Sequence, residues 1–116
     1  GILIDIGNFM CADEAPNEAV RRLLPYVRHV HAKDFHYLPS DAADPGEGWF
    51  RTRGKNYLRG AIIGHGNANA AISLGMLANA NYDGWISIEF EGMEDNLRGI
   101  ALGRENALRY FKKSEK

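Results

Sequence analysis

Short apolar runs alternate along this chain with longer amphipathic segments, a pattern typical of strands followed by helices. The runs predict strands over residues 2–6, 28–34 and 85–91. The first run is continuously apolar, as in strands that are buried on both faces. The third is interpreted as a buried strand, because every second residue from Ile86 to Phe90 is apolar and the residues between them are polar.

Apolar residues three to four positions apart predict three helices, at about residues 17–24, 69–80 and 95–113. Pro16 suits the first position of a helix, and Pro25 ends the same helix because proline is excluded from a helix interior. The resulting order is β-α-β-loop-α-β-α. Strands that alternate with helices predict an α/β fold in which parallel strands are joined by right-handed crossovers.

Residues 35–60 show neither the alternation of a strand nor the spacing of an amphipathic helix, and they contain several prolines and glycines. A loop of this length is uncommon in a compact domain unless it is functional or disordered, and its aromatic residues argue against plain disorder. We therefore expect a lid-like loop that covers a ligand. Its basic residues are expected either to hold a phosphate or to form a solvated face.

Length and composition fit one domain over residues 1–116, with 45% hydrophobic residues and a formal net charge of -1. This balance gives no reason to expect nucleic acid or an anionic membrane as a partner. The single Cys11 fits a reducing compartment, and no signal peptide is visible, so a cytoplasmic location is expected. Because the chain starts at Gly1 within an apolar run, it is expected to be a fragment of a longer protein.

Three possible metal ligands fall at or near the ends of the predicted strands: Asp5, His31 and Glu89. The carboxyl ends of parallel strands meet at one edge of a sheet, so these residues are expected to share a site. Two carboxylates and an imidazole suit Mn²⁺, Mg²⁺, Co²⁺ or Zn²⁺. Each residue also has a structural interpretation: a turn-forming Asp5, a hydrogen-bonded core His31, and a Glu89 paired with Lys33.

Three motifs occur in order: His-Ala-Lys-Asp at 31–34, Gly-His-Gly at 64–66, and Tyr-Asp-Gly followed by Glu89 at 82–89. In this order they resemble the xylose isomerase-like TIM-barrel family of sugar and sugar-phosphate isomerases and epimerases. The resemblance implies the C-terminal part of a (β/α)8 barrel, about its last three βα units, with the barrel incomplete in this chain.

The same resemblance implies a divalent metal ion and a small sugar or sugar phosphate as substrate. The family's metal-binding Asp, His and second Glu correspond to Asp5, His31 and Glu89, and its first metal-binding Glu would lie upstream of residue 1. Glu89 would also act as an acid/base carboxylate next to a carbonyl polarised by the metal. Implied substrate-binding residues are Lys33, Arg59 and His65, although Lys33 is equally expected to pair with Asp34.

Two other interpretations remain open at this point. A zinc nuclease of the endonuclease IV type shares the fold, but Asn8 and the segment 59–61 lack two of its zinc ligands. Alternatively, the chain is a catalytically incomplete barrel fragment that only folds or self-associates. Three or four strands cannot close an eight-stranded barrel, so its open edges would favour a homo-oligomer.

Overall fold

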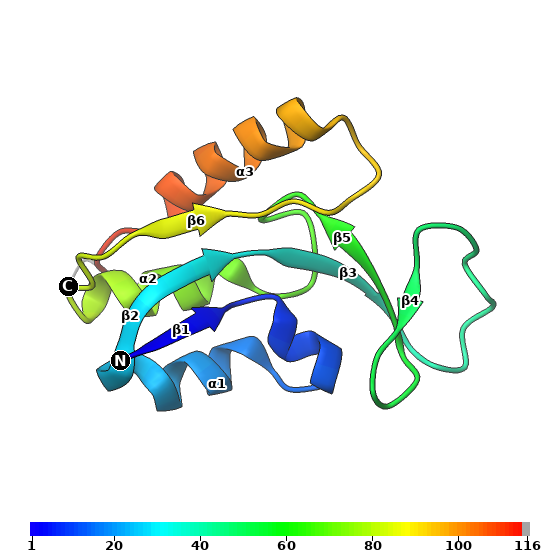
Figure 1. Cartoon of the computed structure of the whole chain (residues 1–116), viewed down its shortest axis with the longest axis horizontal. Coiled ribbons are helices and arrows are strands. Elements are labelled where there is room, and N and C mark those ends of the chain that lie inside the picture. Colours follow the sequence, from blue (N-terminus) through cyan, green and yellow to red (C-terminus); the bar gives the residue numbers. More distant parts are fainter. Residues whose placement is uncertain (115–116) are drawn as a thin grey trace.

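In the computed structural model, which describes residues 1–114, a three-stranded parallel sheet forms the centre of the molecule (Figure 1). Its strands lie in the order β1 (Ile2–Asp5), β2 (Val27–Ala32) and β6 (Ile86–Ile88). Both neighbouring pairs are parallel. The predicted parallel arrangement of these three strands is therefore confirmed.

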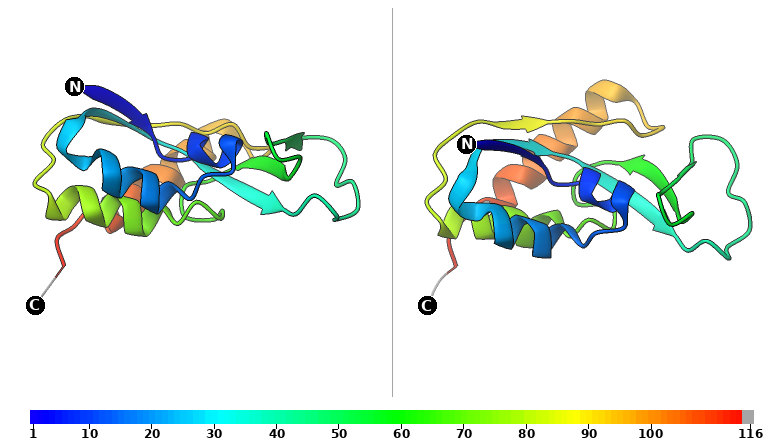
Figure 2. Two further views of the ribbon diagram at one scale, coloured as in Figure 1. Left: turned by 90° about the horizontal axis from the view of Figure 1, so that it is seen from below. Right: turned by 60° about the horizontal axis from the view of Figure 1, so that its bottom comes forward.

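Helices follow the strands as the periodicity predicts: α1 (Pro16–Leu23), α2 (Ala70–Asn79) and α3 (Asn96–Tyr110). Two short 3-10 turns, η1 (Asn8–Ala12) and η2 (Leu24–Tyr26), join the neighbouring elements. Figure 2 shows α1 and α2 under one face of the parallel sheet, and α2 packs against both α1 and α3. The helices thus cover one face of this sheet.

The main hydrophobic core lies between that face and the helices. Val30 and Ala32 of β2 point into it and are fully buried, whereas His29 and His31 lie on the opposite face and are only partly buried. This alternation is what a strand dictates, because successive side chains point to opposite faces. The polar face of β2 is therefore available for a site. On the opposite face, the apolar side chains of β2 share the core with Ile4, Val20, Ile63, Leu74 and Leu77.

A second sheet extends the molecule beyond the carboxyl ends of the parallel strands (Figure 1). It is antiparallel, in the order β3 (Asp34–Leu38), β5 (Tyr57–Ala61) and β4 (Phe50–Arg51). The prediction of one loop over 35–60 is therefore wrong at both ends of that range. β5 shows no alternation of apolar and polar residues, because both of its faces are buried. Its neighbouring residues Tyr57 and Leu58, for example, are both buried.

The predicted strand at 85–91 is shorter in the structure, and its residues are only partly buried rather than buried. β6 forms one edge of the parallel sheet and β1 forms the other, so the sheet does not close into a barrel within residues 1–114. The predicted strand 28–34 divides at Lys33 into β2 and β3. Among the residues described, no helix is both long and apolar enough to cross a membrane.

Candidate metal centre

The pairing of the parallel strands places the predicted ligands side by side. Asp5 is the last residue of β1 and pairs with His31 in the register of β1 and β2. His31 in turn pairs with Ser87 of β6, and the Glu89 N–H donates to the Ala32 carbonyl at 3.0 Å. Glu89 therefore continues the hydrogen-bonded pairing of β6 with β2 by one residue, and its side chain lies on the same face as that of Ser87.

The side chains of Asp5, His31 and Glu89 converge. Each offers one ligand atom, and these atoms all lie within 4.8 Å of one another. His31 Nδ1 lies 2.6 Å from Glu89 Oε1. This contact lacks hydrogen-bond geometry, and Glu89 Oε1 is buried without a hydrogen-bond partner among residues 1–114. A buried acceptor without a donor is costly, and a bound cation would satisfy it.

The electrostatics of the cluster also favour a cation. Burial raises the pKa of the Asp5 carboxyl, although the Asn8 N–H and the charge of Lys33 act in the opposite direction. The nearby charge of Glu89 raises this pKa further. A divalent ion would offset the desolvation and the repulsion between the carboxylates. Two carboxylates and one imidazole are a donor set that suits such an ion, so these residues fit the predicted group.

Lys33, the single residue between β2 and β3, also belongs to the surroundings of the cluster. Its Nζ lies 3.8 Å from Asp5 Oδ2, 3.9 Å from Glu89 Oε2 and 2.5 Å from Glu91 Oε1. Burial lowers the pKa of Lys33, but the hydrogen bond to Glu91 and the three carboxylate charges outweigh burial and raise it. The ammonium therefore stays charged next to the candidate ligands.

Two of the structural interpretations describe contacts that are present. Asp5 Oδ1 accepts the Asn8 N–H at 3.0 Å, so Asp5 also stabilises the turn after β1. Glu89 lies within ion-pair distance of Lys33, as stated above. Neither contact removes Asp5 or Glu89 from the cluster. The pairing of Lys33 with Asp34 is not formed, because Asp34 is buried in contact with backbone N–H groups instead.

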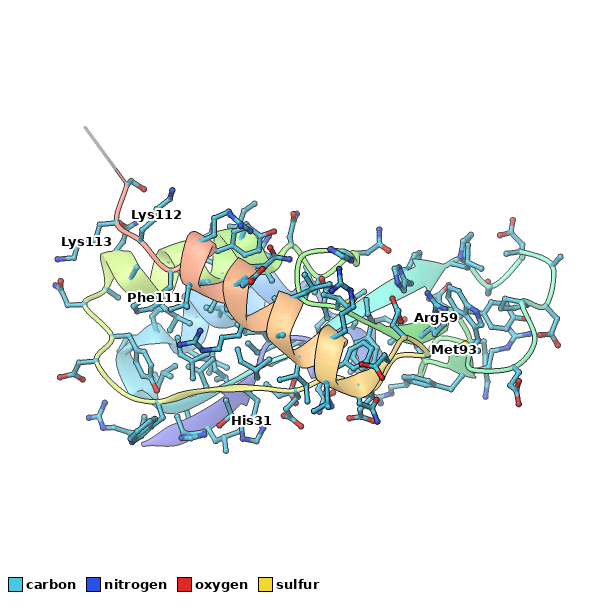
Figure 3. All side chains as sticks on the ribbon, turned by 90° about the horizontal axis from the view of Figure 1, so that it is seen from above. His31, Arg59, Met93, Phe111, Lys112 and Lys113 are labelled. Atoms are coloured by element: carbon cyan, nitrogen blue, oxygen red, sulfur yellow. The ribbon has the colours of Figure 1, made fainter. Side chains whose placement is uncertain are left out.

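Arg59 lies apart from this cluster, and among residues 1–114 His65 does not belong to the group of possible ligands that converges there. Arg59 pairs with His36 across β3 and β5, so both side chains lie on one face of the antiparallel sheet. Phe35 points to the other face, and the Lys33 ammonium lies 5.8 Å from its ring centroid. In Figure 3, Arg59 lies beside Met93 and far from His31.

Sequence reasoning did not predict the roles of two carboxylates around the site. Asp34 Oδ1 accepts the N–H groups of Phe35 and Ala68, and Oδ2 accepts those of Gly64 and Gly66, all within 2.8–3.0 Å. Its donors lie up to 34 residues away, so no local pattern could reveal this role. Glu91, in contrast, follows Glu89 by two residues, and strand alternation alone would have placed both carboxylates on one face.

Comparison with known proteins agrees with this architecture. A family model described as xylose isomerase-like TIM barrel matches residues 1–113. Similar curated proteins include the inosose dehydratases of Bacillus anthracis (strain CDC 684 / NRRL 3495), Bacillus thuringiensis subsp. konkukian (strain 97-27) and Bacillus cereus (strain 03BB102). Each is 32% identical over 92 residues, which cover 78% of this chain.

The chain spans only about 30% of the length of these relatives. Parallel strands that alternate with helices and do not close on themselves are what part of an eight-stranded barrel provides. The family match covers nearly the whole chain and agrees with the motifs at 31–34, 64–66 and 82–89. This chain belongs to the xylose isomerase-like TIM-barrel family.

Proposed function

We propose that this chain carries part of the active site of a divalent-metal-dependent enzyme that acts on a small sugar or sugar phosphate. The observation that carries the proposal is the convergence of Asp5, His31 and Glu89 within 4.8 Å of one another at the ends of adjacent parallel strands. Active sites of TIM barrels lie at this end of the strands. These three side chains would hold the ion and leave coordination positions for further ligands and for substrate oxygens.

The proposed reaction is the movement of a proton on the carbon next to a carbonyl, as in an isomerase or epimerase. When bound, a divalent ion supplies a Lewis acid that polarises the carbonyl. The Glu89 carboxylate would accept or return the proton, since a positioned carboxylate can serve as a general base. The Lys33 ammonium, buried and charged, would stabilise negative charge that develops on the substrate oxygen.

A second reaction, dehydration, is favoured by the names of the similar proteins, which are inosose dehydratases. Loss of water from a polyhydroxy ketone can begin with the same step, removal of a proton next to the carbonyl. The hydroxyl on the following carbon then takes up a proton, from the Glu89 carboxyl or from solvent, and leaves as water, which yields a product one water molecule lighter. The two reactions therefore share Glu89 and Lys33 and differ in the fate of the substrate after proton removal.

Purified full-length protein should be incubated with Mn²⁺ and a panel of ketoses, inososes and their phosphates in D₂O. Uptake of deuterium from the solvent is expected for both reactions: next to the carbonyl in isomerisation or epimerisation, and on the carbon that has lost its hydroxyl in dehydration. Mass spectrometry then separates them. An unchanged heavy-atom composition identifies isomerisation or epimerisation, whereas loss of water identifies dehydration. No deuterium uptake and no Mn²⁺ binding would contradict the proposal and would favour a chain that only folds or self-associates.

A further inference from the structure

Glu91 lies next to the proposed metal cluster, and within residues 1–114 its side chain forms its ion pair with Lys33. Its Oε1 lies 2.5 Å from the Lys33 Nζ. The Glu91 side chain is 64% exposed, whereas the Lys33 side chain is only 8% exposed. The pair therefore joins a buried ammonium to a carboxylate that reaches solvent.

The Lys33 ammonium competes with a metal ion for the same oxygens. It lies 3.8 Å from Asp5 Oδ2 and 3.9 Å from Glu89 Oε2, and both carboxylates belong to the proposed ligand set. Like charges at such distances repel, and the repulsion is strong where water is excluded. An uncompensated lysine at this position would therefore weaken the binding of a divalent cation.

The backbone of Glu91 is held in place by the second sheet. Gly92 forms a parallel bridge with Gly60 of β5. A Cβ atom at Gly60 would collide with the carbonyl carbon and oxygen of Glu91, so the glycine permits this close approach. The antiparallel sheet thus positions the carboxylate that faces Lys33.

We propose that Glu91 is a positioning residue that acts as the counter-ion of Lys33. Its carboxylate holds the ammonium and offsets its charge, so a divalent ion can bind to Asp5, His31 and Glu89 while Lys33 stays charged beside the substrate. This inference rests on the proposed function. Glu91 itself contacts neither the ion nor the reacting atoms.

One single and one double variant of the full-length protein test this role, with Mn²⁺ affinity measured by isothermal titration calorimetry. Glu91→Gln is expected to weaken Mn²⁺ binding about tenfold, because Lys33 keeps its charge and loses its counter-ion. Lys33→Met combined with Glu91→Gln is expected to restore the affinity to within about threefold of wild type. Glu94→Gln is the matched control, because Glu94 is also exposed and forms no ion pair within residues 1–114.

The outcomes separate this inference from the function on which it rests. If the wild-type protein binds Mn²⁺ but Glu91→Gln binds it equally well, Glu91 has no such role and the proposed function stands. If the double variant binds as weakly as Glu91→Gln, Glu91 acts on the site without Lys33, and the inference is again wrong. If the wild-type protein binds no Mn²⁺, the proposed function fails, and the inference fails with it.

Discussion

The parallel and antiparallel sheets of this chain are built on different principles. The parallel sheet has one face covered by helices and packs residues such as Val30 and Leu74 into a continuous core. The antiparallel sheet packs around a much smaller cluster, formed by Met10, Phe35, Leu58 and Ala68. Hydrogen bonds such as those of Asp13 with Thr52 and Asn56 also attach it to the rest of the molecule. The parallel sheet thus places the candidate ligands, while the antiparallel sheet contacts the residues that surround them, such as Glu91.

The two sheets meet at Lys33 and Asp34, between β2 and β3. Lys33 points toward the carboxylates of the candidate metal centre, and Asp34 points toward the loop that contains Gly64 and Gly66. The side chains of these two neighbouring residues therefore point to opposite faces, as strand geometry requires. Changes in either sheet are expected to have distinct consequences, which the following predictions compare.

The largest expected difference is between two histidines, one from each sheet. His31→Ala removes one of the three candidate ligands and is expected to weaken Mn²⁺ binding by about a hundredfold or more. His36→Ala, in the antiparallel sheet, is the control and is expected to change Mn²⁺ affinity by less than about threefold. Titration calorimetry on both variants measures the comparison. Equal losses would show that the assignment of ligands to the parallel sheet is wrong.

A smaller but still large effect is expected at the junction. Asp34→Ala removes the acceptor of four backbone N–H groups and is expected to lower the free energy of unfolding by about 3–5 kcal/mol. Asp34→Asn keeps the shape and one acceptor oxygen, so it should cost less. Urea unfolding of both variants measures the difference. Full stability of Asp34→Ala would contradict the role assigned to this carboxylate.

The smallest effect is expected where the hairpin of β4 and β5 is attached to the turn after η1. Asp13 accepts hydrogen bonds from the Thr52 hydroxyl at 2.6 Å and the Asn56 amide at 2.9 Å, and these bonds lower its pKa. The Gly54 N–H adds a third bond, at 2.6 Å. A carboxyl with a lowered pKa stabilises the folded state above its unfolded pKa, and this stability is lost as the pH falls through the folded value.

Thermal melts at several pH values test this attachment. Asp13→Asn is expected to melt at a lower temperature than wild type between about pH 6 and pH 8. The difference should shrink as the pH falls below about 4, where the carboxyl of the unfolded chain takes up a proton first, and should be smallest once the folded carboxyl is protonated as well. Asp41→Asn provides a control, since Asp41 is exposed and accepts no side-chain hydrogen bond within residues 1–114. A difference that does not depend on pH would show that the charge of Asp13 is unimportant.

The same contrast explains how much the sequence could predict. The helix at Ala70–Asn79 lies within one residue of its predicted bounds at each end, because the whole segment is apolar and its buried positions, such as Ala70, Leu74 and Leu77, recur at helical spacing. β5 left no such signal, since it is buried on both faces and contains both Arg59 and Gly60. Local patterns report how a segment is buried. They do not report which distant strand it pairs with.

The candidate site shows the same limit. Asp5, His31 and Glu89 could be grouped from sequence because each was assigned to the carboxyl end region of a predicted strand, and parallel pairing brings such ends together. The position of Arg59 could not be predicted, because it depends on an antiparallel pairing with β3 that no local period revealed. The substrate-binding roles of Arg59 and His65 remain predictions.

The central claim is that Asp5, His31 and Glu89 bind one divalent cation. Crystals of the full-length protein grown with Mn²⁺ test it directly, through the anomalous scattering of the metal. The account predicts one strong anomalous peak within bonding distance of Asp5, His31 Nδ1 and Glu89. A peak at another place, or no peak at a Mn²⁺ concentration that saturates the protein in solution, would contradict it.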